Sequence, residues 1–247
     1  MNKIKTTDLS VRFRMSYDKI TSASQFLLET KARLQGNWRP NYFSALSNVN
    51  LEVKQGEIIG LIGANGSGKT TLLRTIAGIY EPDAGTVQTN GKISALLQLG
   101  TGLNNKLSGR ENIILGGLTL GLSKAQILED IEKIIEFSGI GDFIDTPMRF
   151  YSSGMISRLS FSIIAFVSPD ILLIDETLSV GDIGFQEKSK KTMDKLMQDA
   201  SCQIIVSHSL DTIQELATRV CIIDAGKIIV DDVPSKSIEE YKKLATA

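Results

Sequence analysis

The chain has 247 residues, 42% of them hydrophobic and 22% charged, and this balance is typical of a folded globular protein rather than a disordered one. Its 27 basic and 28 acidic residues nearly cancel, so it lacks the basic excess typical of proteins that hold nucleic acid through phosphate contacts. No stretch approaches the roughly 18–20 apolar residues of a membrane helix, and the first residues lack the apolar run of a signal peptide. We therefore expect a cytosolic protein without a nucleic-acid partner, which meets a membrane only by docking.

The first part of the chain alternates short strand patterns with one clear helix. Residues 4–13 mix polar and apolar side chains as an edge strand does, and residues 51–53 alternate in the same way. Between them, residues of about 14–43 are polar and weakly patterned, which predicts an inserted loop with room for a short helix. An apolar strand over 57–62 ends in glycines and leads into a helical pattern over 70–76.

The second part of the chain combines a helical segment with three buried strands. Within a helical stretch of about 108–165, residues 123–137 carry apolar side chains at helical spacing after a serine cap, which predicts an amphipathic helix. Three continuous apolar runs of strand length suit strands buried on both faces of a parallel sheet: 171–174, 203–206 and 220–223. This order predicts a single α/β domain over 1–247. Cys202 and Cys221 lie in or beside these runs, so we expect buried free thiols.

One glycine-rich stretch has the pattern of a phosphate-binding loop. Gly63-Ala-Asn-Gly-Ser-Gly-Lys-Thr70 matches G-x-x-x-x-G-K-[ST] at every fixed position, between a predicted strand and a predicted helix. Glycines let the backbone wrap around phosphates, and the N–H groups at a helix start favour negative charge. Lys69 can reach the β- and γ-phosphates, and the Thr70 hydroxyl can bind Mg²⁺. A glycine-rich turn with a chance lysine is the alternative, and the correctly placed strand and helix argue against it.

Other polar residues follow predicted strands or open a predicted helix. Asp175 and Glu176 end the strand at 171–174, where Asp175 can hold Mg²⁺ and Glu176 can polarise a water that attacks the γ-phosphate. His208, the one histidine, follows the strand at 203–206 and could sense that phosphate. Gln98 alone would be an exposed amide at a strand end. Tyr151-Ser-Ser-Gly-Met155 has the hydroxyls, glycine and helix start for a second phosphate contact, and it lies far along the chain from Lys69.

In this order, these motifs resemble the ATP-binding cassette (ABC) family over essentially the whole chain. The resemblance implies a P-loop NTPase core with a mostly parallel sheet, an antiparallel β lobe and a helical subdomain. It implies that Gln98 contacts Mg²⁺ and a transmembrane partner, that residues 179–182 form the D-loop, and that His208 is the switch histidine at the γ-phosphate. It also implies an aromatic ring that stacks on adenine, for which Phe13 is the aligned residue and Tyr42 a competitor. The implied ATP-binding residues are Gly63, Ala64, Asn65, Gly66, Ser67, Gly68, Lys69, Thr70, Thr71, Phe13, Ser152, Ser153 and Gly154.

The departures from the family pattern indicate a subfamily. The usual signature Leu-Ser-Gly-Gly-Gln is Tyr-Ser-Ser-Gly-Met here, and it is similar to that of exporters of lipid-linked polysaccharides. The run at 175–182, the stretch at 107–112 and the insert at about 14–43 share that similarity. Several of these relatives have Glu in place of Gln98. O-antigen is the expected cargo, with capsule or teichoic acid as alternatives, and because the chain ends at Ala247 we expect no carbohydrate-binding domain.

The resemblance also implies partners and a location. Two copies would close head to tail over two ATP molecules with Mg²⁺, and Glu176, His208 and Lys69 would carry the hydrolysis. A separate integral-membrane permease would handle the polysaccharide, and this chain would dock peripherally on the cytoplasmic face of the inner membrane. Two other classes compete. A soluble ABC ATPase acting on nucleic acid would carry long insertions after the phosphate loop, and a small-molecule kinase would leave Gln98 and His208 without a role.

Overall fold

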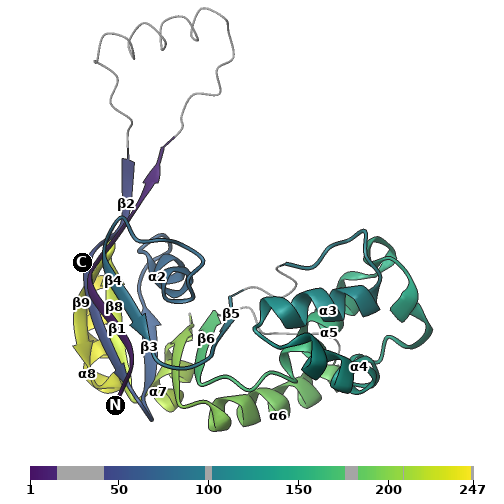
Figure 1. Cartoon of the computed structure of the whole chain (residues 1–247). Helices are drawn as coiled ribbons and strands as arrows, with labels where there is room; N and C mark the ends of the chain where they lie inside the picture. The colour runs from purple at the N-terminus through teal and green to yellow at the C-terminus, as the bar shows by residue number, and fades with distance from the viewer. Residues whose placement is uncertain (16–41, 98–101, 176–182, 208, 246–247) are drawn as a thin grey trace, which may run out of the picture.

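The structure is a computed structural model, and it describes residues 1–15, 42–97, 102–175, 183–207 and 209–245. Two sheets stand side by side with helices around them, and a separate group of helices lies on the other side of β5 and β6 (Figure 1). Most of the insert expected at 14–43 falls outside the described residues, although strands extend into both of its ends.

The central sheet has six strands in the order β5-β6-β7-β3-β8-β9. Neighbours pair in parallel except β8 and β9, which form an antiparallel pair. The strands are β3 (Ile58–Ile62), β5 (Ile93–Leu96), β6 (Ile171–Asp175), β7 (Cys202–Val206), β8 (Arg219–Asp224) and β9 (Lys227–Asp232). The apolar runs predicted as buried parallel strands are therefore confirmed.

The second sheet is antiparallel, with the order β2-β1-β4. Its strands are β1 (Asn2–Arg14), β2 (Tyr42–Lys54) and β4 (Ala84–Thr89). The prediction that residues 4–13 form an edge strand is wrong, because β1 is the middle strand. Its second neighbour, β4, consists almost entirely of exposed residues and so lacks the apolar pattern by which a strand is recognised.

Helix α2 (Lys69–Ile76) follows the phosphate loop and packs into the core between the two sheets. Three helices cover the central sheet on the side away from the antiparallel one: α6 (Ile183–Asp199), α7 (Leu210–Leu216) and α8 (Pro234–Ala245). Alternate side chains of one strand enter different cores: Leu173 packs between the two sheets, whereas Leu172 packs toward α6, α7 and α8. Burial on both faces explains why the runs at 171–174, 203–206 and 220–223 are apolar apart from Gln203. Cys202 and Cys221 are free and buried in the first core, as predicted.

A helical part with its own core follows β5. It contains α3 (Gly109–Thr119), α4 (Lys124–Ser138), the 3₁₀ helices η1 (Gly141–Asp145) and η2 (Met148–Phe150), and α5 (Ser153–Ile164). The predicted helix over 123–137 is confirmed as α4, and Ser123 forms a capping box with Gln126 at its start. None of the helices in the described ranges is both long and apolar enough to cross a bilayer.

Candidate functional site

The phosphate loop joins the carboxyl end of β3 to the start of α2, as its sequence context predicts. Two of its glycines have backbone angles and surroundings that exclude a side chain. Gly63 has φ +152°, and a Cβ there would lie 2.2 Å from the carbonyl oxygen of Ile223. Gly68 has φ +115°, and its Cβ would lie 2.7 Å from the carbonyl oxygen of Ala45. The loop therefore packs against both sheets in a shape that only glycine permits at these points.

Lys69, the first residue of α2, is 8% exposed and folds back over its own loop. Its Nζ donates to the carbonyl oxygens of Gly63 at 2.7 Å and Ala64 at 2.9 Å. Burial lowers the pKa of Lys69, and the negative charge of Asp175 opposes that change. The ammonium group is thus held at the loop by neutral acceptors, which phosphate oxygens can replace with stronger, charged ones.

The next residue, Thr70, bridges the phosphate loop to β6. Its Oγ1 donates to Oδ2 of Asp175 at 3.1 Å, across 105 positions of the chain. A hydroxyl and a carboxylate oxygen are the ligand types that Mg²⁺ takes in proteins, usually together with phosphates and water. The Oγ of Ser67 is buried without a hydrogen-bond partner among the described residues, which fits a loop built to receive an oxygen-rich anion. These residues therefore fit a Mg²⁺-bound nucleotide.

A cavity of about 250 Å³ brings the loop together with aromatic side chains. Asn65, Gly66, Gly68, Lys69, Thr70, Thr71, Asp175 and Val206 line it, with Ala45 and two rings, Phe13 and Phe43. Phe13 lies directly opposite Phe43 across β1 and β2, whereas Tyr42 pairs with Arg14 one position further along. Successive side chains of a strand face opposite sides, so Phe43 rather than Tyr42 lines this cavity. The sequence reasoning considered Tyr42 and missed Phe43.

The turn between β8 and β9 is a second feature that the sequence reasoning missed. Gly226, with φ +76°, donates its N–H to the carbonyl oxygen of Ser67 at 2.8 Å, and its carbonyl accepts from the N–H of Ser47 at 2.9 Å. The turn thus connects the phosphate loop to β2. The signal was a pair of small turn residues, Ala225 and Gly226, between two apolar strands.

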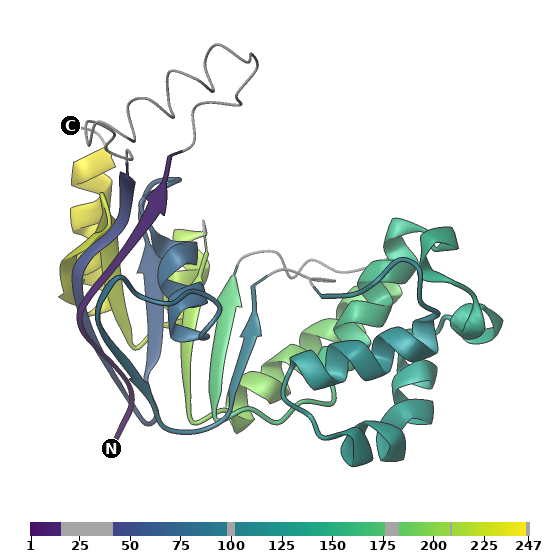
Figure 2. The same cartoon turned by 45° about the horizontal axis from the view of Figure 1, so that its top comes forward.

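The other predicted phosphate contact, at the start of α5, lies elsewhere in the chain's fold. Ser152 caps the helix by accepting the N–H of Met155 at 3.2 Å, and Ser152 and Ser153 are exposed. Tyr151 is buried beside them and donates its hydroxyl to the carbonyl oxygen of Phe143 at 2.7 Å, which fixes the turn before the helix. Both views place α5 across β5 and β6 from α2, so one chain does not bring Ser152, Ser153 and Gly154 to its own phosphate loop (Figures 1 and 2).

Gln98, Glu176, His208 and the D-loop at 179–182 lie outside the described residues. The elements that precede them are described. Gln98 comes two residues after β5, Glu176 directly after β6, and His208 two residues after β7. These strands run parallel to β3, so their carboxyl ends lie at the same edge of the sheet as the phosphate loop.

A larger cavity of about 430 Å³ lies between the sheets and the helical part. On one side it is lined by Arg74 of α2, by Ile79 and by β5, and on the other by residues of α3 and α5. Most of its lining is apolar, as in Ile93, Leu103 and Ile163. Leu97, the last described residue before Gln98, also lines it.

The sequence model of the ABC transporter family matches residues 46–179, which include the phosphate loop, Asp175 and the start of α5. The chain belongs to the ABC transporter family. Among curated ABC proteins, it is 42% identical over 82% of its length to the ABC transporter protein AbcA of Aeromonas salmonicida and covers 66% of that protein. It is 41% identical over 81% of its length to the O-antigen export system ATP-binding protein RfbB of Klebsiella pneumoniae, covering 82% of it.

A third relative of this ABC protein is named for the export of another polymer. The chain is 43% identical over 82% of its length to the teichoic acids export ATP-binding protein TagH of Lactococcus lactis, and it spans 43% of that longer protein. Among solved structures, a dimeric ATP-binding cassette in a post-hydrolysis state with ADP and Pi matches with a TM-score of 0.66 at 19% identity, covering 94% of this chain and 98% of the other. The α/β ABC ATPase fold expected from the sequence is confirmed.

Proposed function

We propose that this chain is the ATP-hydrolysing subunit of an exporter of lipid-linked polysaccharide, most closely an O-antigen exporter. The main support for ATP hydrolysis is the hydrogen bond between Thr70 and Asp175 beside the buried Lys69. A hydroxyl, a carboxylate and a cation thus lie together at one cavity. The polysaccharide part rests on the relatives, two of which are export ATP-binding proteins for cell-surface glycans at 41% and 43% identity.

The residues of the cavity divide the work of holding ATP. Phe13 and Phe43 would contact the base, the loop from Gly63 to Thr70 would wrap the phosphates, and Lys69 would give up the carbonyls of its own loop for phosphate oxygens. Thr70 and Asp175 would hold Mg²⁺, which offsets phosphate charge when bound. Glu176, directly after β6, would orient the attacking water, and His208 and Gln98 would complete the γ-phosphate end from neighbouring strand ends.

The exposed start of α5 implies a second copy of the chain. Ser152, Ser153 and Gly154 form a capped, solvent-facing helix start whose N–H groups favour an anion, and it is remote from the chain's own phosphate loop. In a head-to-tail pair this helix start would meet the nucleotide of the other copy. ATP would then stabilise the closed pair through contacts that hydrolysis removes.

We also propose that a separate membrane permease docks at the larger cavity and handles the polysaccharide. The apolar lining of this cavity could bind an apolar segment of a partner. Leu97, which lines the cavity, is next in sequence to Gln98, the residue expected to contact the permease. The chain would then act at the cytoplasmic face of the inner membrane as a peripheral subunit, organised as one ATPase domain with a helical subdomain at about 108–165.

The experiment that tests this function uses Glu176→Gln in cells and with purified protein. The amide keeps the shape of the carboxylate but cannot polarise water in the same way, so ATP should bind without turnover and the closed dimer should accumulate with ATP and not with ADP. In cells, undecaprenyl-linked glycan should remain on the cytoplasmic side. Stranded glycan made of sugar repeats supports O-antigen, and polyol phosphate units would assign teichoic acid instead. Wild-type export and turnover in this variant would refute the proposal.

A further inference from the structure

Tyr80 contacts the ring that faces the nucleotide cavity without lining that cavity itself. It lies in the segment between α2 and β4, and its ring centroid is 5.3 Å from that of Phe13. The two planes meet at 75°, which is the edge-to-face arrangement that aromatic pairs favour. Phe13 is 38% exposed and Tyr80 is half-buried, so Tyr80 is the inner ring of the pair.

Arg74 holds Tyr80 in this orientation. Its Nη1 donates to the Tyr80 hydroxyl at 2.9 Å, and its guanidinium carbon lies 5.8 Å from the ring centroid. The backbone is fixed as well, because the N–H of Tyr80 donates to the carbonyl oxygen of Arg74 at 3.3 Å. Arg74 belongs to α2, the helix that Lys69 and Thr70 begin, so one rigid element carries the phosphate-loop residues and the support of the aromatic pair.

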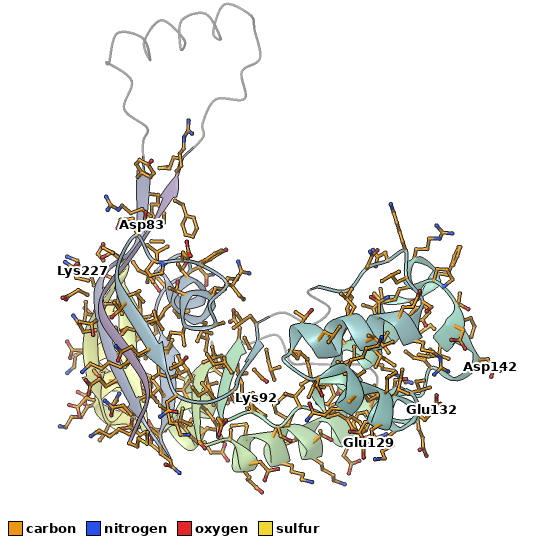
Figure 3. All side chains as sticks on the ribbon, in the orientation of Figure 1. Asp83, Lys92, Glu129, Glu132, Asp142 and Lys227 are labelled. Carbon is orange, nitrogen blue, oxygen red and sulfur yellow. The ribbon has the colours of Figure 1, made fainter. Side chains whose placement is uncertain are left out.

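The segment is also attached to β1 just before Phe13. Asp83 donates its N–H to the carbonyl oxygen of Ser10 at 2.9 Å, and its Oδ2 accepts the N–H of Arg12 at 2.6 Å. Figure 3 labels Asp83 at the end of the antiparallel sheet where β1 and β2 project beyond β4. The segment from α2 to β4 thus joins the strand that carries Phe13 to the helix that carries Lys69.

We propose that Tyr80 is a positioning residue for nucleotide binding: held by Arg74, it fixes the Phe13 ring at the angle at which the base stacks. The proposal rests on the proposed function, because it requires that Phe13 contacts the base. An unsupported exposed ring would have to be ordered each time that ATP binds, and that cost would weaken binding. Arg74 also lines the larger cavity, so the same pair connects the base site to the surface at which the permease would dock.

The test compares two ligands that differ in the base. ATP and inorganic tripolyphosphate are titrated calorimetrically into the whole protein carrying Tyr80→Leu, Phe13→Ala or both. An edge-to-face pair contributes about 0.5–1.5 kcal/mol, so Tyr80→Leu should weaken ATP binding about two- to tenfold and leave tripolyphosphate binding unchanged. In the Phe13→Ala background, Tyr80→Leu should have no further effect. In steady-state ATP hydrolysis, Tyr80→Leu should raise KM and leave kcat unchanged.

Further variants separate positioning from folding. Tyr80→Phe keeps the ring and removes the hydroxyl, so it should fold normally and weaken ATP binding about twofold, as should Arg74→Gln. Tyr241→Leu is the matched control: it is the same substitution in α8, where Tyr241 packs against the core on the other face of the sheet, and it should not change ATP affinity.

The outcomes distinguish this inference from the proposed function. If Phe13→Ala leaves ATP affinity unchanged, the base does not stack there, and both the base site and the role of Tyr80 are refuted. If Phe13→Ala weakens ATP binding while Tyr80→Leu and Tyr80→Phe do not, only the role of Tyr80 is refuted. Equal losses for ATP and tripolyphosphate in Tyr80→Leu would also refute it, because they would show a general disturbance of the loop.

Discussion

Lys69 and Thr70 are neighbours at the start of α2, yet their side chains bind different parts of the fold. Lys69 bonds to carbonyls of its own loop, whereas Thr70 bonds to Asp175 at the end of β6. Binding of a nucleotide therefore changes the two residues differently. The ammonium group exchanges neutral acceptors for charged ones, and the hydroxyl and the carboxylate of a preformed pair become available to a metal ion.

Lys69→Ala should abolish ATP hydrolysis and weaken ATP binding at least tenfold. Hydrogen bonds to charged groups contribute about 1.5–3 kcal/mol each, and the variant removes the cation nearest to the β- and γ-phosphates. Nucleotide titration and a phosphate-release assay measure both effects. Lys191→Ala is a suitable control, since Lys191 is an exposed lysine that pairs with Glu187 on α6. Turnover near the wild-type rate in Lys69→Ala would show that the loop is not the site.

The two thiols should be inert in the folded protein. Burial raises the pKa of Cys202 to about 11 and that of Cys221 still further, and the thiolate is the reactive form. At pH 8, Ellman's reagent should therefore react with neither thiol on the timescale of minutes, and with both after unfolding in guanidinium chloride. Fast reaction of one thiol in the native state would place that cysteine outside the core.

At the scale of elements, the phosphate loop depends on a turn that does not line the nucleotide cavity. The β8–β9 turn donates to Ser67 through Gly226, and a Cβ at Gly226 would lie 2.6 Å from the carbonyl oxygen of Ala45. Neither the turn nor the loop can therefore move without disturbing β2.

Gly226→Ala should destabilise the protein by about 1–3 kcal/mol and weaken ATP binding, because it adds both a steric clash and backbone strain at φ +76°. Gly121→Ala separates the two causes, since Gly121 has φ +84° but open space around its Cβ position. Chemical denaturation and ATP titration of both variants give the comparison. Equal stability and unchanged ATP affinity in Gly226→Ala would show that the turn does not support the loop.

Elements were predictable from the sequence where burial imposes a pattern. The strands at 171–174, 203–206 and 220–223 are apolar apart from Gln203 because both faces are covered, and the capping box of Ser123 and Gln126 marks the start of α4. β4 gave no such signal, because its burial is slight and its position depends on pairing with β1. Because β4 was not recognised as a strand, β1 was predicted to lie at the edge of its sheet instead of in the middle.

At the site, residues were predictable where chemistry restricts the residue type. The phosphate loop and Asp175 could be located because phosphates require glycines and a lysine at set positions, and Mg²⁺ requires a carboxylate beside them. Phe43 and Gly226 could not, since an aromatic residue and a turn glycine are common. Only the register of β1 with β2 brings Phe43 to the cavity, and only the packing of the β8–β9 turn brings Gly226 to the phosphate loop.

At the scale of the whole molecule, the separation of α5 from the phosphate loop predicts a site shared between two copies. Ser153→Arg should leave ATP binding to the isolated chain nearly intact and stop turnover, because the added charge and bulk would block the other copy's nucleotide. Mixed in equal amounts, Ser153→Arg and Lys69→Ala chains should regain activity, since one site in each mixed pair is intact. Calorimetry and phosphate release measure the two effects. A loss of binding in Ser153→Arg alone as large as in Lys69→Ala would place Ser153 at its own chain's nucleotide.

The order of strands in the central sheet also has a consequence for how the protein is made. β3, whose end forms the phosphate loop, has β7 and β8 as its neighbours, and these strands are synthesised about 140 and 160 residues later. A chain still emerging from the ribosome thus carries the whole loop sequence while the strands that would shape it are missing. Strand pairing over such separations is slow, and unpaired apolar strands are prone to aggregation in the interval. A nascent chain should therefore bind no ATP until residues near 226 have left the exit tunnel, and truncation before β7 should yield an insoluble product rather than a weaker enzyme.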